Sequence, residues 1–97
     1  MVTAVVRHKV KDMRVWQKVF EENLDALWKS GCTSAKVLRA VDDPLNLTVV
    51  CEWPEMKQLQ AFVTSQMDSK NAERGGVIGI PEGRILENFK LYEPKRA

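Results

Sequence analysis

The sequence lacks the residue sets that mark metal sites and small disulfide-rich proteins. Its 97 residues include one histidine, His8, and two cysteines, Cys32 and Cys51. One histidine and two isolated cysteines offer no ligand pair at zinc spacing, so we expect no bound metal. Two cysteines are also too few for the disulfide framework of a small secreted domain.

Long apolar runs and a charge excess of one sign are missing as well. The 15 cations and 13 anions are mixed along the chain and leave a net charge of +2, without the basic stripe of a nucleic-acid-binding protein. No apolar run approaches the roughly 20 residues that cross a bilayer. The N-terminal stretch MVTAVVRHKVKDM has no basic region followed by a long apolar core, so we do not expect it to act as a secretory signal. We expect a cytoplasmic protein that binds neither membrane nor nucleic acid.

The glycine-rich segment VIGIPEG is not a phosphate loop, because it lacks a Gly-Lys-Ser/Thr ending and leads into a strand. We therefore expect no nucleotide cofactor, and no cofactor of any other kind. What remains is the composition of one globular domain, with 44% hydrophobic and 29% charged residues. A chain of this length fits a single domain over residues 1–97.

Hydrophobic spacing predicts alternating strands and helices. Period-two spacing with β-branched residues is typical of strands, whereas an apolar stripe at helical spacing predicts a helix. The predicted order is a strand over 3–10, a helix over 13–30, strands over 34–41 and 47–53, a helix from about 54 and a strand over 84–92. The second helix fades after Val63, restarts near Ser65 as a short helix and ends at Gly75-Gly76, before a loop over 77–83.

The order β-α-β-β-α-β predicts an α+β, ferredoxin-like fold with both helices on one face of a four-stranded antiparallel sheet. The strands carry apolar residues at both parities, so the helix-free face is also apolar. An exposed apolar face marks a binding surface, and a second copy of the same sheet would cover it. We expect a homodimer.

The hairpin between the two central strands is predicted to turn at Pro44 and Leu45. That register places Cys51 opposite a residue near Leu38, about 20 Å from Cys32 at roughly 3.3 Å per residue. Two free thiols are therefore expected.

His8 is the main candidate for a catalytic residue. In the stretch VVRHKV, alternation places His8 on the helix side with Val6 and Val10, and its two cationic neighbours on the other face. Burial under Trp16 and Phe20 would keep the imidazole neutral near pH 7. It could then act as a general base or donate a hydrogen bond to a ligand carbonyl. The alternative is a structural histidine that binds a backbone carbonyl.

Aromatic residues are the main candidates for substrate binding. Trp16, Phe20, Trp28 and Trp53 could form a wall for a flat ligand, or they could fill the core of a small domain. Asn71 lies on the weak second helix, where it could line a cavity mouth or belong to a solvated surface.

Three stretches, VVRHKVKDMRVWQKVF, VLRAVDDPLNLTVVCEW and SQMDSKNAERGGVIGIPE, resemble small bacterial proteins of the dimeric α+β barrel superfamily. Within this superfamily the chain resembles the antibiotic-biosynthesis-monooxygenase-like proteins and proteins named cyclases, and the resemblance covers about residues 4–92. It implies two sheets paired into a barrel through their helix-free faces, with a ligand cavity between sheet and helices. Proteins of this fold include cofactor-independent oxygenases, haem-degrading enzymes, isomerases and cyclases. The Asn/Trp/Arg set of the oxygenases and the Asn/Trp/His set of the haem-degrading enzymes do not map onto matching positions here, so no catalytic role is carried over.

Two functions follow from these features. The first is a small cofactor-independent enzyme, of oxygenase, cyclase or isomerase type, that binds a flat apolar metabolite between sheet and helices. The second is a non-catalytic binding or structural dimer module. A cavity of about 300 Å³ or more beside His8 would favour the first, since that is the lower end for small-molecule sites.

Overall fold

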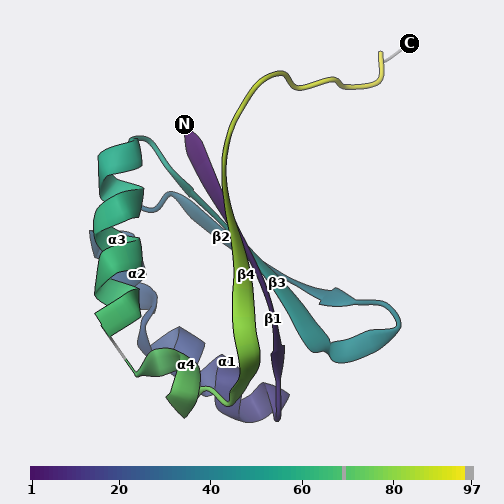
Figure 1. Ribbon diagram of the computed structural model, residues 1–97. Helices are drawn as coiled ribbons and strands as arrows, with labels where there is room; N and C mark the ends of the chain where they lie inside the picture. The colour runs from purple at the N-terminus through teal and green to yellow at the C-terminus, as the bar shows by residue number, and fades with distance from the viewer. Residues whose placement is uncertain (69, 96–97) are drawn as a thin grey trace.

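The computed structural model describes residues 1–68 and 70–95. The elements are β1 (Val2–Val10), α1 (Met13–Glu22), α2 (Leu24–Lys29), β2 (Ser34–Ala40), β3 (Asp43–Trp53), α3 (Met56–Asp68), α4 (Asn71–Arg74) and β4 (Val77–Glu87). The strands form one antiparallel sheet in the order β2-β3-β1-β4. The helices lie on one side of this sheet (Figure 1), so the predicted ferredoxin-like fold is confirmed.

The core lies between the sheet and the helices. Alternate residues of β3 are buried, as the strand's period of two requires, namely Leu47, Val49, Cys51 and Trp53. Ala4 of β1 pairs with Cys51, and both side chains are buried. From the helices, Trp16, Leu27 and Leu59 complete this core.

The first helical segment begins as expected but is interrupted. The Asp12 carboxylate caps α1, because Oδ1 accepts hydrogen bonds from the backbone N–H of Arg14 at 2.8 Å and of Val15 at 3.4 Å. The predicted single helix over 13–30 is divided at Asn23, whose side-chain Nδ2 donates to the Val19 carbonyl at 2.8 Å. Asparagine competes in this way for backbone groups and weakens a helix interior.

The β2–β3 hairpin turns earlier than predicted. Ala40 pairs with Asp43, so the turn consists of Val41 and Asp42 and not of Pro44 and its neighbours. The Asp43 carboxylate accepts a hydrogen bond from the Leu45 N–H at 3.1 Å and forms an ion pair with Lys9 of β1 at 3.0 Å. These contacts hold Asp43 as the first residue of β3.

The earlier turn changes the place of the cysteines. Cys51 lies opposite Ala35, three positions from Cys32, and the Cys32 thiol is near enough to affect the pKa of Cys51. The predicted separation of about 20 Å is therefore wrong, although both cysteines are free. Burial, with the neighbouring Cys32 thiol, raises the pKa of Cys51 to about 12.

The C-terminal third also differs from the prediction. The helix α3 continues past Val63, and the short helix restarts at Asn71 and not near Ser65. The segment 77–83, expected as a loop, is the first part of β4, and the strand ends at Glu87 and not at residue 92. Residues 88–95 then extend away from the domain as an arm (Figure 1).

β4 contains a bulge opposite His8. Arg7 pairs with Glu82 and Lys9 with Ile78, so the register shifts between them and residues 79–81 bulge out of the ladder. Gly79 supports the bulge with a φ of 74°, a left-handed conformation that glycine adopts without strain. Within the described residues, no helix has both the length and the apolar character needed to cross a membrane.

Candidate functional site

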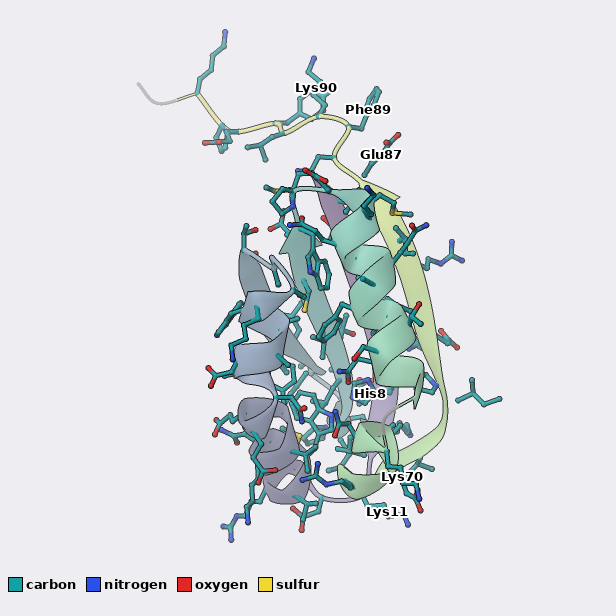
Figure 2. All side chains as sticks on the ribbon, turned by 90° about the vertical axis from the view of Figure 1, so that its left-hand side faces the viewer. His8, Lys11, Lys70, Glu87, Phe89 and Lys90 are labelled. Atoms are coloured by element: carbon teal, nitrogen blue, oxygen red, sulfur yellow. The ribbon has the colours of Figure 1, made fainter. Side chains whose placement is uncertain are left out.

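His8 lies on the helix side of the sheet, as the alternation in β1 predicts. It pairs with buried Leu47 across the ladder, and its ring centroid is 5.6 Å from that of Trp16 on α1. Figure 2 shows His8 in the space between the helices. On the opposite face, Arg7 forms a 3.9 Å ion pair with Glu82. The predicted sides of β1 are confirmed.

The His8 imidazole has no polar partner within the described residues. Both Nδ1 and Nε2 are buried, and neither makes a hydrogen bond there. Burial lowers the pKa of His8, so the ring is neutral at pH 7. A buried donor or acceptor without a partner costs about 1–3 kcal/mol, and native structures contain few of them. Among the described residues, His8 therefore does not match the alternative expectation of a structural histidine that hydrogen-bonds a backbone carbonyl.

An aromatic groove begins next to His8. Trp16 contacts His8 and also stacks on Phe20, with ring centroids 4.9 Å apart and an interplanar angle of 20°. Both rings line a groove of about 400 Å³ between α1, α2 and the edge strand β2. The other lining residues are Met13, Gln17, Glu21, Leu24, Trp28, Ala35, Val37 and Arg39. The volume exceeds the lower limit of about 300 Å³ for small-molecule sites.

His8 itself does not line this groove, because Trp16 is the residue that both contacts the imidazole and borders the open volume. A ligand in the groove would therefore contact Trp16, and Trp16 would separate it from the imidazole. Trp16, Phe20 and Trp28 thus lie where a flat ligand would contact them.

Trp53 lies elsewhere. Its side chain is only 2% exposed, and its indole Nε1 donates to the Ser30 Oγ at 2.9 Å. Its ring packs against that of Phe62 at a centroid distance of 5.7 Å. These contacts are those of a core residue, so the structure does not bring Trp53 to the groove.

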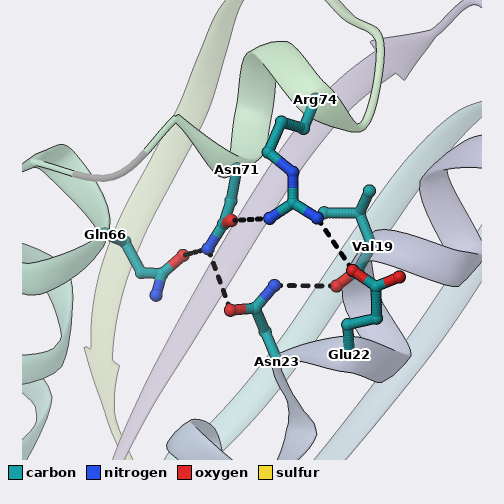
Figure 3. Close-up of polar contacts among 6 residues, drawn as sticks. All are labelled: Val19, Glu22, Asn23, Gln66, Asn71 and Arg74. Carbon is teal, nitrogen blue, oxygen red and sulfur yellow. Dashed lines mark hydrogen bonds and ion pairs between the residues drawn. The ribbon is translucent and has the colours of Figure 1, made fainter.

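Asn71 belongs to a polar network that connects α4 to the junction of α1 and α2 (Figure 3). Its Nδ2 donates to Asn23 Oδ1 at 3.0 Å and to Gln66 Oε1 at 3.3 Å. Arg74 donates from Nη1 to Asn71 Oδ1 at 3.2 Å and from Nη2 to Glu22 Oε2 at 2.8 Å. Asn71 therefore positions α4 and does not line the groove.

The network holds α4 close to the catalytic candidate. A Cβ added to Gly75, directly after α4, would lie 3.3 Å from Cδ1 of Trp16 and 3.2 Å from the Asn71 carbonyl oxygen. The backbone at this glycine therefore packs closely on the indole that contacts His8. The α4 segment covers Trp16, and the Asn71 network keeps it there.

Arg39 and Val37 of β2 were not among the residues predicted for the site. Ala35, Val37 and Arg39 share one parity of β2 and face the helix side, since Ala35 pairs with buried Cys51 and Val37 with buried Val49. The alternation in the sequence shows that these three residues share one face of the strand. It does not show which face, because that depends on the register of the hairpin.

A second hollow, on the exposed side of α1, is a weaker candidate for a functional site. A hollow of about 490 Å³ lies along the exposed side of α1 and is lined only by Arg14, Gln17, Lys18, Glu21 and Glu22. These side chains are solvent-exposed and include no aromatic ring. The part of the chain that the structure describes contains no group of three potential metal ligands.

Comparison with known proteins identifies the fold. No family model and no curated protein matches the sequence. SnoaB from Streptomyces nogalater, a cofactor-independent oxygenase, superposes with a TM-score of 0.77 at 15% identity, covering 93% of this chain and 94% of SnoaB. The ActVA-Orf6 monooxygenase of Streptomyces coelicolor, in complex with nanaomycin D, gives 0.69 at 14% identity over 97% and 92%. A candidate antibiotic biosynthesis monooxygenase from Bordetella bronchiseptica gives 0.75 at 13% identity over 92% and 97%.

These similarities extend over nearly the whole of each chain. The protein has the fold of the antibiotic biosynthesis monooxygenase-like proteins, and the resemblance expected from the sequence is confirmed at that level. A shared fold does not by itself assign a reaction, so function has to be argued from His8 and the groove.

Proposed function

We propose that this protein is a small cofactor-independent enzyme of oxygenase type that acts on a flat, apolar metabolite. The observation that carries this proposal is His8, a neutral imidazole next to an aromatic groove, whose two buried nitrogens have no hydrogen-bond partner among the described residues. The occurrence of cofactor-independent oxygenases among proteins of the same fold supports it. The nanaomycin D complex of another such protein supports a small-molecule ligand.

The chemistry assigned to His8 is proton transfer. A neutral imidazole accepts a proton at one nitrogen and donates one from the other, so it can remove the proton of a phenol that enters past Trp16 and contacts His8. The resulting phenolate is richer in electrons and reacts more readily with dioxygen. A C–O bond forms at a ring carbon while the C–H bond at that carbon and the O–O bond break, so the product is a quinone and the second oxygen atom leaves as water. The substrate supplies two electrons and two protons, so the balance needs no further reductant.

Replacement of His8 tests this role. His8→Phe keeps roughly the volume of the ring and removes both nitrogens. With a panel of polycyclic phenols and quinols and an oxygen electrode, we expect turnover by the wild type and a loss of about 100-fold or more in the variant. Gln60→Ala is the control, because Gln60 is exposed on α3 and its side chain has no role in the groove. Normal turnover by a folded His8→Phe protein would reduce His8 to a packing residue.

One observation favours a second function, that of a non-catalytic binding module. Trp16 lies between His8 and the groove, so a ligand could bind there without reaching the imidazole. The same panel separates the two functions. A binding module would retain ligands in the wild type and in His8→Phe alike, and would consume no oxygen in either form.

We further propose that the protein acts as a homodimer whose helix-free sheet faces pack together. Leu38, Ile78 and Leu86 are large apolar side chains on that face, and 44%, 49% and 47% of their surfaces are exposed in the single chain. The arm supports the same assembly, because Phe89 is 96% and Leu91 79% exposed. Two neighbouring cysteines that are both free support a reducing, cytoplasmic location.

A further inference from the structure

Arg39 adds a positive charge to a groove whose other walls are mainly aromatic and aliphatic. The groove has an apolar body, formed mainly by Trp16, Phe20 and Trp28 together with aliphatic side chains of α1, α2 and β2. Of the described residues that line it, Arg39 is the only cation. It lies on β2, an edge strand of the sheet, and its side chain is exposed.

The Arg39 guanidinium is available to a ligand. Its side chain makes no ion pair or hydrogen bond with any residue that the structure describes. The remaining polar side chains of the groove, Gln17 and Glu21, are bonded to each other, with Gln17 Nε2 donating to Glu21 Oε1 at 2.9 Å. A ligand with an acidic group would therefore find one unengaged cation next to an apolar surface.

We propose that the ligand of this groove is a flat aromatic carboxylate, with its ring system on Trp16, Phe20 and Trp28 and its carboxylate on Arg39. This inference rests on the proposed function and specifies the substrate class for the same site. The planar guanidinium matches a carboxylate through two parallel hydrogen bonds, which a neutral hydroxyl cannot reproduce. Glu21 on the facing wall disfavours a second negative charge, so a monoanion fits better than a phosphate dianion.

The three tryptophans provide a direct readout of binding. Trp16 and Trp28 line the groove, whereas the Trp53 indole N–H is buried and donates to Ser30. In ¹H–¹⁵N spectra, 2-naphthoate should shift the indole signals of Trp16 and Trp28 and leave that of Trp53 in place. Its neutral analogue 2-naphthalenemethanol has the same ring system and should bind about fivefold more weakly, as expected for one exposed ion pair.

Variants assign this difference to Arg39. In Arg39→Gln the preference for naphthoate should disappear, and Arg39→Lys should retain part of it, because the charge remains without the planar fork. Arg14→Gln is the matched control, since Arg14 is an exposed arginine on the outer side of α1 and does not line the groove. Raising the salt concentration should reduce the preference in the wild type and not in Arg39→Gln.

Two results would overturn the inference, and they differ in whether the groove remains a candidate binding site. Equal affinity of naphthoate and naphthalenemethanol, with shifts of Trp16 and Trp28, would remove Arg39 as a determinant and leave the groove as a site for flat ligands. No shift of either indole with either probe would remove the groove as a binding site altogether. The catalytic role of His8 is tested separately by oxygen consumption.

Discussion

His8 is held on the apolar side of a sheet with neither ring nitrogen hydrogen-bonded to a described residue. A phenylalanine of similar shape would avoid the desolvation of two polar atoms, so the position is not optimised for stability. Such trade-offs are common where a residue serves binding or catalysis. The side of β1 on which His8 lies followed from period-two alternation, but the lack of a partner depends on every element around it and could not be predicted.

The lowered pKa of His8 predicts a specific pH dependence of stability. Burial disfavours the charged ring, so the folded pKa lies below the unfolded value of about 6.5. Between these two values the unfolded chain binds a proton and the folded chain does not. The free energy of unfolding should therefore be highest above pH 6.5 and fall as the pH drops through this window.

Urea unfolding at pH 7.5 and pH 5.0 measures this effect. We expect the wild type to lose more stability over the interval than His8→Phe, which has no histidine to titrate. The carboxylate of Asp43, whose pKa is lowered mainly by its hydrogen bond with Lys9, titrates below this interval in both proteins. An NMR titration of the single histidine gives an independent value, and an apparent pKa at or above 6.5 would show that the imidazole is hydrated.

At the scale of the elements, the polar network around Asn71 joins the two helical segments that enclose the candidate site. Asn23 interrupts the first helix and in doing so presents Oδ1 to the Asn71 amide. The interruption therefore has a function in packing, because it gives α4 a partner on the opposite segment.

A double-mutant cycle tests that coupling. Asn23→Ala and Asn71→Ala should each lower the free energy of unfolding by about 1 kcal/mol, the usual net contribution of a side-chain hydrogen bond. The double variant should lose less than the sum, with a coupling of about 0.5 kcal/mol or more. Unfolding in urea gives these values, and Gln60→Ala on the exposed side of α3 serves as control. Strict additivity would mean that the two amides do not stabilise each other.

Element types and their order were predictable because they depend on periodicity within one segment. Apolar residues at helical spacing predicted α1, and alternation of apolar and polar residues predicted β1 and β3. Turn and end positions were not predictable in the same way. The hairpin turn depends on Asp43, whose carboxylate pairs with Lys9 on a strand far away in the sequence. A shift of the turn by a few residues was enough to misplace Cys32 relative to Cys51.

For the whole molecule, the arm predicts that assembly depends on residues outside the sheet. Figure 2 shows Phe89 and Lys90 on a segment that leaves the domain. We expect the wild type to sediment at about twice the chain mass of 11.1 kDa at micromolar concentration. Phe89→Ser combined with Leu91→Ser should weaken the dimer about tenfold or more, because two large apolar side chains per arm lose their contacts.

The control for this experiment is Val41→Ser. Val41 is 105% exposed at the tip of the hairpin, away from the arm, so its replacement should leave the dimer unchanged. A wild-type protein that sediments as a monomer would refute the assembly. An arm variant with unchanged dimer affinity would assign the contact to the sheet face alone.

The bulge in β4 has a further consequence for how molecules meet in solution. β4 is an edge strand, and an edge with a regular row of free N–H and C=O groups invites other chains to add strands and aggregate. Residues 79–81 interrupt that row, and Pro81 has no N–H to offer. The irregularity opposite His8 thus also makes this border of the sheet a poor template for fibril growth.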